Sequence, residues 1–394
     1  MKAGWKLKTL GEIYDVRDGT HDSPKYQDEG YPLITSKNLK TGRLNFERVK
    51  FISEEDYLSI NRRSKVNKGD LLFAMIGTIG NPTLVEVTPN FAIKNVALLK
   101  PPENQSVHFL KYYLETKIVM DQMKTDAKGT TQKFVGLNYL RNFQIPLPPL
   151  EEQKRIVSIL DEAFQGLDRA RENAEANLKS ARELFSANLQ STLDPKGKIE
   201  WEIKSLGDIC EFIGGGTPSK DKPEFYSGQI PWATVRDMMN DHLTKTDHSI
   251  TQAGLSASSS KLIPGGEIVI ASRVGLGKVC VLGQDTAINQ DLRAVIPKDI
   301  NSVEKRFLFH WFKSVAGTIE KAGTGATVKG VKLPFLKSLQ IPLPPLEEQK
   351  RIVFQLDKMS TEYNSLEALY TTKIQDISDL RQSLLQKAFA GELT

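Results

Sequence analysis

The stretch "IPLPPLEEQKRIV" occupies residues 145–157, and the same thirteen letters return at residues 341–353, 196 positions later. Two further pairs have the same offset. "WKLKTLGEI" at residues 5–13 matches "WEIKSLGDI" at 201–209, and "GTTQKFVGLNYLRNFQ" from Gly129 aligns with "GATVKGVKLPFLKSLQ" from Gly325. A period near 200 residues is too long for a solenoid repeat. The repeat therefore predicts two domain-sized copies that share a frame and differ in their interiors.

The quoted stretch also predicts where a helix begins. Its prolines favour an extended approach, and Glu151 and Glu152 then supply acids for a first helical turn. Apolar and alanine residues follow at alternating steps of four and three, sustained over about five heptads in each copy, which is typical of a coiled coil. In the first copy the predicted seam residues are Ile156, Leu160, Ala163, Leu167, Ala170, Ala174 and Leu178. In the second copy they are Ile352, Leu356, Met359, Tyr363, Leu366, Tyr370, Ile377 and Leu384.

These observations predict an α/β (α+β) chain in which two globular domains are separated by a pair of long antiparallel coiled-coil helices, related by a pseudo-two-fold internal repeat. Each lone helix would be marginal in water, and the alanine-rich seam of the first would pack closely against the bulkier seam of the second. The expected limits are 1–145 for the first globular domain, 146–195 for the first long helix, 196–341 for the second domain and 342–394 for the second helix.

The charge is distributed unevenly along the repeat. Residues 1–149 carry 22 basic and 16 acidic side chains, and residues 196–345 carry 19 and 15, whereas the two segments that contain the long helices are acidic. This division favours polyanion binding by the variable segments. The chain has no apolar run long enough to span a membrane and no secretory signal, and Cys210 and Cys280 have no CxxC partner. We therefore expect a cytoplasmic protein with free core thiols and no zinc site.

Searches for a catalytic motif fail. Asn81-Pro82-Thr83-Leu84 resembles the Asn-Pro-Pro-aromatic motif of amino-methyltransferases, but Thr83 and Leu84 break it. "GGGTPSK" from Gly214 lacks the glycine spacing of a P-loop, and the five histidines have no metal-ligand spacing. The sequence therefore predicts no catalytic residue and no metal site.

The variable segments instead contain loops of small polar residues mixed with bases, such as "TSKNLKTGR" from Thr35 and "ASRVGLGK" from Ala271. Arg and Lys neutralise phosphates and read guanine, Asn and Gln read adenine, and Ser and Thr bridge to phosphate. In the first half the residues that we expect to contact DNA are Arg17, Thr20, Lys25, Ser36, Lys37, Asn38, Thr131 and Lys133. In the second half they are Thr217, Ser219, Lys220, Arg236, Arg273, Lys278, Gln290, Arg293, Thr327 and Lys329.

Taken together, the two halves resemble the specificity subunit of a Type I restriction–modification system. Each half opens with "W…LG(E/D)I" and closes with "QIPLPPLEEQKRIV" and a long helix, and the resemblance covers essentially the whole chain. It implies that the globular parts are target-recognition domains for double-stranded DNA, each of which reads one half of a split asymmetric target. It also implies that the helices set the spacer and dock two modification (methyltransferase) subunits.

The resemblance implies that the cofactors belong to the partners and that this chain is not itself an enzyme. S-adenosylmethionine would be bound by the modification subunits for adenine-N6 methylation, and ATP and Mg by restriction (translocase and nuclease) subunits. Two alternatives stay open at this point: a coiled-coil adaptor that binds proteins, and the DNA-reading subunit of another methylation-based phage-defence system.

Overall fold

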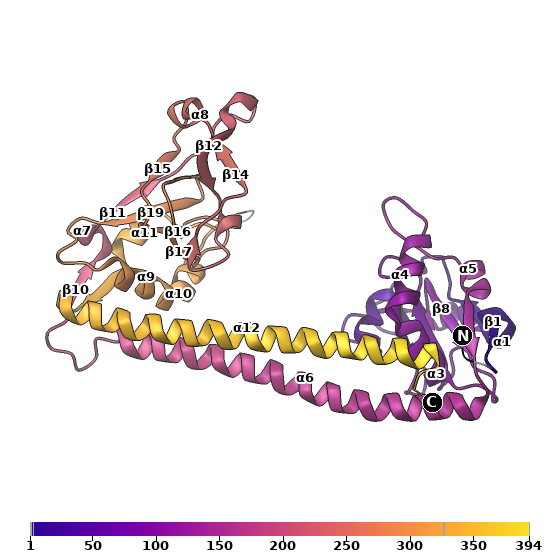
Figure 1. The fold of residues 1–394 in the computed structure, drawn as a ribbon. Coiled ribbons are helices and arrows are strands. Elements are labelled where there is room, and N and C mark those ends of the chain that lie inside the picture. The colour runs from indigo at the N-terminus through magenta and orange to yellow at the C-terminus, as the bar shows by residue number, and fades with distance from the viewer. Residues whose placement is uncertain (1, 3, 326–327, 394) are drawn as a thin grey trace. The chain divides into compact units, whose positions relative to one another are not determined.

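The computed structural model describes residues 2, 4–325 and 328–393, which form two compact units. Unit 1 comprises Met1–Glu175 with Thr371–Thr394, and unit 2 comprises Ala176–Tyr370. Each unit contains one globular domain and part of each of two long helices, α6 (Leu150–Leu193) and α12 (Leu346–Ala390) (Figure 1).

The domain of unit 1 is built on a four-stranded sheet of order β2-β8-β5-β6, a three-stranded sheet of order β4-β3-β7 and the pair β1-β9. Its strands are β1 (Lys6–Thr9), β2 (Asp15–Asp18), β3 (Tyr31–Ile34), β4 (Lys50–Ile52), β5 (Leu71–Ala74), β6 (Gly80–Leu84), β7 (Ala92–Ile93), β8 (Val96–Lys100) and β9 (Gln144–Leu147). Its helices and 3₁₀ turns are α1 (Leu10–Ile13), η1 (Ser36–Asn38), η2 (Lys40–Gly42), α2 (Glu54–Ser64), α3 (Val107–Glu115), α4 (Lys117–Asp126) and α5 (Leu137–Asn142).

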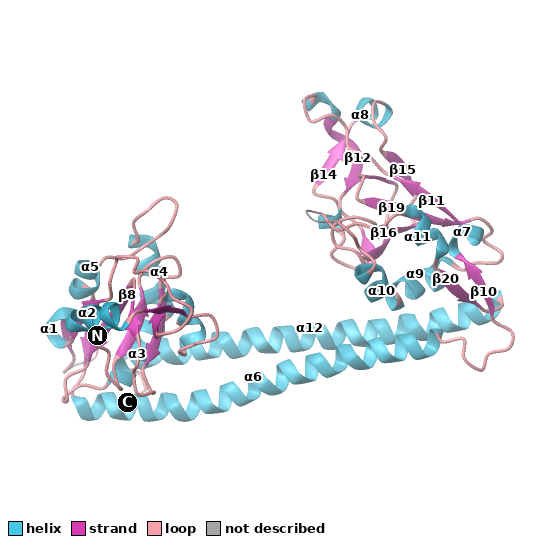
Figure 2. Ribbon diagram, turned by 180° about the vertical axis from the view of Figure 1, so that it is seen from behind, coloured by secondary structure: helices cyan, strands magenta, loops and turns pink. Residues whose placement is uncertain are grey.

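The domain of unit 2 repeats this plan with sheets of order β11-β19-β16-β17-β13 and β14-β12-β18-β15, and the pair β10-β20 (Figure 2). Its strands are β10 (Glu202–Ser205), β11 (Cys210–Gly214), β12 (Tyr226–Ala233), β13 (His242–Leu243), β14 (His248–Ile250), β15 (Lys261–Ile263), β16 (Ile268–Ala271), β17 (Val279–Leu282), β18 (Thr286–Ile288), β19 (Leu292–Pro297) and β20 (Gln340–Leu343). Its helices and turns are α7 (Leu206–Ile209), η3 (Pro223–Phe225), η4 (Val235–Asp237), α8 (Gln252–Ser256), α9 (Lys305–Ser314), α10 (Ala316–Lys321) and α11 (Leu333–Ser338).

The repeated frame closes each domain. The stretch after Trp5 forms β1, which pairs antiparallel with the "QIPL" of β9 in a register that sets Leu7 opposite Pro146. In unit 2, β10 pairs with β20 in the same way, with Ile203 opposite Pro342. The first and last segments of each copy are thus joined, and the chain passes through the last prolines directly into a long helix. This pairing explains why these two stretches, far apart in each copy, are the parts that match.

Each domain core also includes the start of its own long helix and the end of the other. In unit 1, Ile156 and Leu160 of α6 belong to the same buried cluster as Leu385 and Ala388 of α12. In unit 2, the start of α12 shares a cluster with Leu189 and Leu193, at the end of α6. The two helices therefore run antiparallel in both units. The predicted fold class, with two mixed domains and a pair of long helices, is confirmed.

The predicted seam of α6 is shielded throughout. Ile156, Leu160 and Ala174 are buried, and the other four predicted residues are half-buried: Ala163, Leu167, Ala170 and Leu178. In α12, Ile352 and Leu356 are buried, and five more predicted residues are half-buried: Met359, Tyr363, Tyr370, Ile377 and Leu384.

Leu366 departs from the predicted seam, since it is 42% exposed. Its neighbour Glu367 is half-buried instead and accepts a 2.9 Å hydrogen bond from Arg182 of α6. A strict seven-residue count drifts against the 3.6-residue turn of a helix, and here the drift brings a charged pair to the seam. The stacked rings of Tyr363 and Phe185, 4.9 Å apart between centroids, lie one turn away.

The predicted domain limits stay a prediction, although the long helices themselves begin at Leu150 and Leu346. None of the helices among the described residues has both the length and the apolarity that a membrane crossing requires.

Candidate nucleic-acid interface

A buried hairpin in each domain presents a glycine-containing loop. β5 and β16 are buried at every position, as expected for short apolar runs in the middle of a sheet. They continue into β6 and β17 through residues 75–79 and 272–278. In each domain, the buried strands therefore hold this loop at one edge of that domain's main sheet.

A second loop lies against each hairpin. In unit 1 the backbone N–H of Gly77 donates to Lys133 O at 2.9 Å, and Val135 N–H donates to Met75 O at 3.0 Å. In unit 2, Val274 N–H donates to Lys329 O at 3.3 Å. The predicted residues Lys133 and Lys329 are exposed on these second loops, as is Thr131. Thr327, also predicted, lies outside the described residues.

A third loop crosses the turn before β8 or β19. The N–H groups of Thr20 and Gly216 donate to Ile93 O and Ile288 O, each at 3.0 Å. The preceding glycine is required by close approach, because a Cβ at Gly19 would lie 2.2 Å from Ile93 O. At Gly215 the corresponding distance to Ile288 O is 2.1 Å.

A fourth element, a capped 3₁₀ turn, corrects one prediction. In η1 the side-chain oxygen of Asn38 accepts hydrogen bonds from the backbone and hydroxyl of Thr35, and its amide nitrogen donates to Asn45 O at 3.0 Å. Asn38 is only 5% exposed. It holds the turn, and both polar atoms of its side chain already have partners within the protein, which argues against a contact with DNA. Asp237 of η4 caps Thr234 in the same way, which leaves Arg236 exposed on that turn.

The other predicted residues of the first domain differ in availability. Arg17 is bound to Asp15, with its Nη2 2.5 Å from the carboxylate, and it also donates to Arg63 O. The hydrogen bond to Asp15 raises the pKa of Arg17 and lowers that of Asp15. Lys25 and Lys37 are exposed, whereas Thr20 and Ser36 are half-buried.

In the second domain the predicted residues gather around the loops. Seven of them are exposed: Ser219, Lys220, Arg236, Arg273, Lys278, Gln290 and Lys329. The exposed Arg273 has an Nη1 3.7 Å from Asp291, and the half-buried Thr217 donates its hydroxyl to Gln290. Arg293 is half-buried on β19, and its Nε is buried without a hydrogen-bond partner. A buried donor of this kind is costly unless water or a ligand completes it.

Sequence reasoning missed a polar cluster in the first domain. His21 lies between Asp18 and Asn95, with its Nε2 2.8 Å from Asp18 Oδ2 and its Nδ1 2.8 Å from Asn95 Oδ1. Arg63 binds the other oxygen of Asp18, and Lys94 donates to Ser23 at 2.5 Å. The internal repeat carried a signal for Asn95, because "IKN" at residues 93–95 corresponds to "INQ" at 288–290.

Each domain thus presents several polar loops and exposed cationic side chains along one edge of its main sheet, a surface suited to phosphate and base contacts. In the part of the chain that the structure describes, no three His, Cys, Asp or Glu residues are grouped as metal ligands would be. Burial raises the pKa of Cys210 and Cys280 to about 12, so neither thiol is a nucleophile near neutral pH.

The repeated stretch builds a joint between each domain and its long helix through one glutamine. Gln349 is fully buried; it accepts from Glu304 N and donates to Ser302 O and Pro344 O, all at 2.8 Å. The equally buried Gln153 accepts from Ser106 N at 3.0 Å and donates to two oxygens in unit 1. The helix start is therefore fixed to the segment that precedes α3 or α9.

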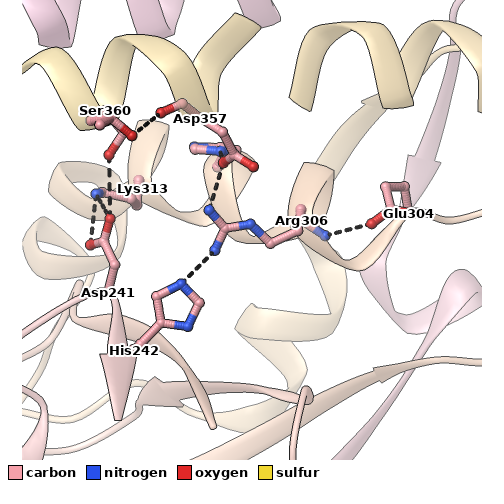
Figure 3. Close-up of polar contacts among 9 residues, drawn as sticks. Asp241, His242, Glu304, Arg306, Lys313, Asp357 and Ser360 are labelled. Atoms are coloured by element: carbon pink, nitrogen blue, oxygen red, sulfur yellow. Dashed lines mark hydrogen bonds and ion pairs between the residues drawn. The ribbon is translucent and has the colours of Figure 1, made fainter. Parts of the chain in front are cut away.

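The joint of unit 2 also contains two ionic groups (Figure 3). Asp357 of α12 lies 2.5 Å from Arg306 Nη2 and 2.6 Å from Nε2 of the fully buried His310. Lys313 binds both carboxylate oxygens of Asp241, at 2.8 and 2.9 Å.

Burial, against the opposing hydrogen bond to Asp357, lowers the pKa of His310. Burial alone would raise the pKa of Asp357, but hydrogen bonds from Arg306 and His310 hold it below its ordinary value. In unit 1 the corresponding Asp161 instead accepts from the hydroxyl of Tyr112. The helix carboxylate is thus paired with a phenol in unit 1 and with an imidazole in unit 2.

Comparison with known proteins gives one consistent family. The model of the Type I restriction modification DNA specificity domain matches residues 2–178 and again residues 198–375. The EcoR124I/EcoR124II specificity subunit of Escherichia coli is 34% identical over 252 residues, which span 61% of this chain and 61% of that protein. The putative MjaX specificity subunit of Methanocaldococcus jannaschii is 26% identical over 89% of this chain and 86% of its own length.

The fold comparison agrees. A solved chain from a study of complex assembly in the type I R-M system aligns with a TM-score of 0.77 and 22% identity, over 100% of this chain and 99% of its own length. At that identity the likeness concerns the fold.

Proposed function

Because the chain belongs to the family of Type I restriction modification DNA specificity domains, we propose that it selects a split DNA target, with each domain reading one half. The observation that carries the proposal is the convergence of polar loops at the same edge of the main sheet in both domains. The same backbone hydrogen bonds hold them, from Thr20 to Ile93 O and from Gly216 to Ile288 O.

The two halves of the target should differ. The backbone crossings are shared, but other side chains beside them are not: His21 and Lys94 in the first domain stand where Thr217 and Asn289 stand in the second. Base recognition depends on the hydrogen-bonding groups that reach base edges. Equivalent loops with different donors and acceptors therefore support an asymmetric target.

We propose further that the catalytic chemistry belongs to partner subunits. Two modification subunits would dock on the frame and helices and use S-adenosylmethionine to methylate adenine at N6. Restriction subunits, where present, would use ATP and Mg. Such a complex would act on DNA in the cytoplasm. An adenine must leave the duplex to be methylated, so this chain would serve to place a modification subunit over its base.

The test is DNA binding by the full chain together with its modification subunit. Phosphate contacts release counterions, so the proposal predicts binding to nonspecific duplex at low salt and a steep loss of affinity as salt rises. A complex that shows no affinity for duplex DNA at low salt would overturn the proposal and favour a protein-binding adaptor.

A further inference from the structure

The two domains share a side-chain pair that their sequences do not make obvious. In the first domain, His21 Nδ1 lies 2.8 Å from Asn95 Oδ1. In the second, the Thr217 hydroxyl donates to Gln290 Oε1. Each pair joins the loop that follows the close-approach glycine to the turn that precedes β8 or β19.

The backbone shows that the pairs are equivalent. His21 and Thr217 each follow the residue whose N–H donates to Ile93 O or Ile288 O, at 3.0 Å in both domains. Asn95 and Gln290 each stand two positions after the accepting isoleucine. Two different loops thus present the same group, a carboxamide with one hydrogen bond to the facing loop.

The carboxamides are accessible and held in place. Gln290 and His21 are exposed, and Asn95 is half-buried. Asn95 has a φ of 55°, a left-handed conformation that Asn tolerates better than most residues. The His21 ring is itself fixed, because Nε2 lies 2.8 Å from a carboxylate oxygen of Asp18, which is 5% exposed.

We infer that Asn95 and Gln290 are matched base-reading residues, one in each domain, and that each binds the major-groove edge of an adenine. His21 and Thr217 are positioning residues that fix the plane of the facing carboxamide. This inference rests on the proposed function and names the base that each site takes.

Hydrogen-bond chemistry supports adenine. A carboxamide oxygen has two lone pairs and its nitrogen has two donors. Thr217 takes one lone pair of the Gln290 oxygen, and the His21 ring takes one hydrogen-bonding position of the Asn95 carboxamide. Each oxygen can still accept from adenine N6 while the nitrogen donates to N7, the bidentate pairing that Asn and Gln make with adenine. A fixed carboxamide also loses less freedom on binding than a mobile one.

The test selects bound duplexes from randomised DNA, using the full chain with its modification subunit. Asn95→Gly removes the carboxamide and tolerates the left-handed backbone. Gln290→Met removes the second carboxamide at similar size. Two matched controls make the same substitutions away from the polar loops. Asn104→Gly lies in the turn after the C-terminal end of β8, and Gln284→Met lies in the turn after the C-terminal end of β17.

Asn95→Gly should abolish the preference for one adenine in one half of the target. Gln290→Met should abolish the preference for one adenine in the other half. Each loss should be about 5- to 150-fold in discrimination, with the remaining positions, the salt dependence and both controls unchanged. Thr217→Val should relax the same position as Gln290→Met, whereas Thr217→Ser, which keeps the hydroxyl, should preserve it.

Three outcomes would overturn the inference: an unchanged base profile in both carboxamide variants, a uniform loss of affinity with a shallower salt slope, or a lost preference for a base other than adenine. If Thr217→Val leaves the profile intact, the positioning role is overturned. If the unaltered complex enriches no sequence at all, the proposed function fails, which is a different result from unchanged variants of a selective complex.

Discussion

Replacing Gln349 with Met should lower the free energy of unfolding of unit 2 by more than the loss of a single hydrogen bond would. The fully buried carboxamide makes three hydrogen bonds of 2.8 Å, to Glu304 N, Ser302 O and Pro344 O. A hydrogen bond contributes about 1 kcal/mol net, and a buried group left without a partner costs about 1–3 kcal/mol. Met fills the space but satisfies none of the three groups. We therefore expect a loss of about 3 kcal/mol or more in the free energy of unfolding.

The effect can be measured by scanning calorimetry alongside tryptophan fluorescence, since Trp201, Trp232 and Trp311 all lie in unit 2. In a unit of roughly 200 residues, about 3 kcal/mol lowers the unfolding midpoint by about 6–12 °C. The control is Lys350→Met, one residue further along α12, where an exposed ion pair with Glu347 contributes little. The reasoning fails if the Gln349 variant unfolds within about 1 °C of that control.

Three further predictions concern pH, salt and assembly. The pKa of His310 is lowered in the folded state, so as the pH falls below the ordinary histidine pKa of 6.5 the unfolded state binds more protons, and the stability of unit 2 should fall from pH 7 toward pH 5. His310→Gln should flatten this dependence in urea unfolding at several pH values, and an equal slope in both proteins would count against the prediction. Lys329→Ala should reduce the slope of log affinity against log salt by about one phosphate's worth, and an unaltered slope would remove Lys329 from the interface. A fragment of residues 1–195 lacks the α12 segment whose Leu385 and Ala388 complete the core of unit 1, so the uncovered α6 should pair with α6 of a second fragment in a concentration-dependent antiparallel dimer. Sedimentation of a folded monomer at high micromolar concentration would refute this.

The long helices and the frame could be predicted because their signals are local or repeated. Heptad spacing singled out Ile156 and Leu160, which are buried, and the duplicated stretches marked the strands that close each domain. Leu366 could not be placed by counting sevens, since the exchange of a leucine for Glu367 depends on Arg182 of the other helix.

The interface was harder to predict because its residues come from separate loops. A composition argument selected Asn38 for its amide, although Thr35 three residues earlier already indicated a local cap. His21 and Asn95, 74 residues apart, are brought together only by the crossing of two loops. Arg63 of α2 reaches the same cluster through its ion pair with Asp18. Long-range contacts of this kind leave no periodic pattern in the sequence.

The central claim is that two different domains read two different halves of one DNA target. It is tested most directly by single-molecule methylation mapping of a host that carries this chain and its modification subunit. We predict methylated adenines within two short, unlike sequences separated by a fixed gap of unspecified bases. A continuous or palindromic methylated sequence, or a host whose methylation does not change, would contradict the account.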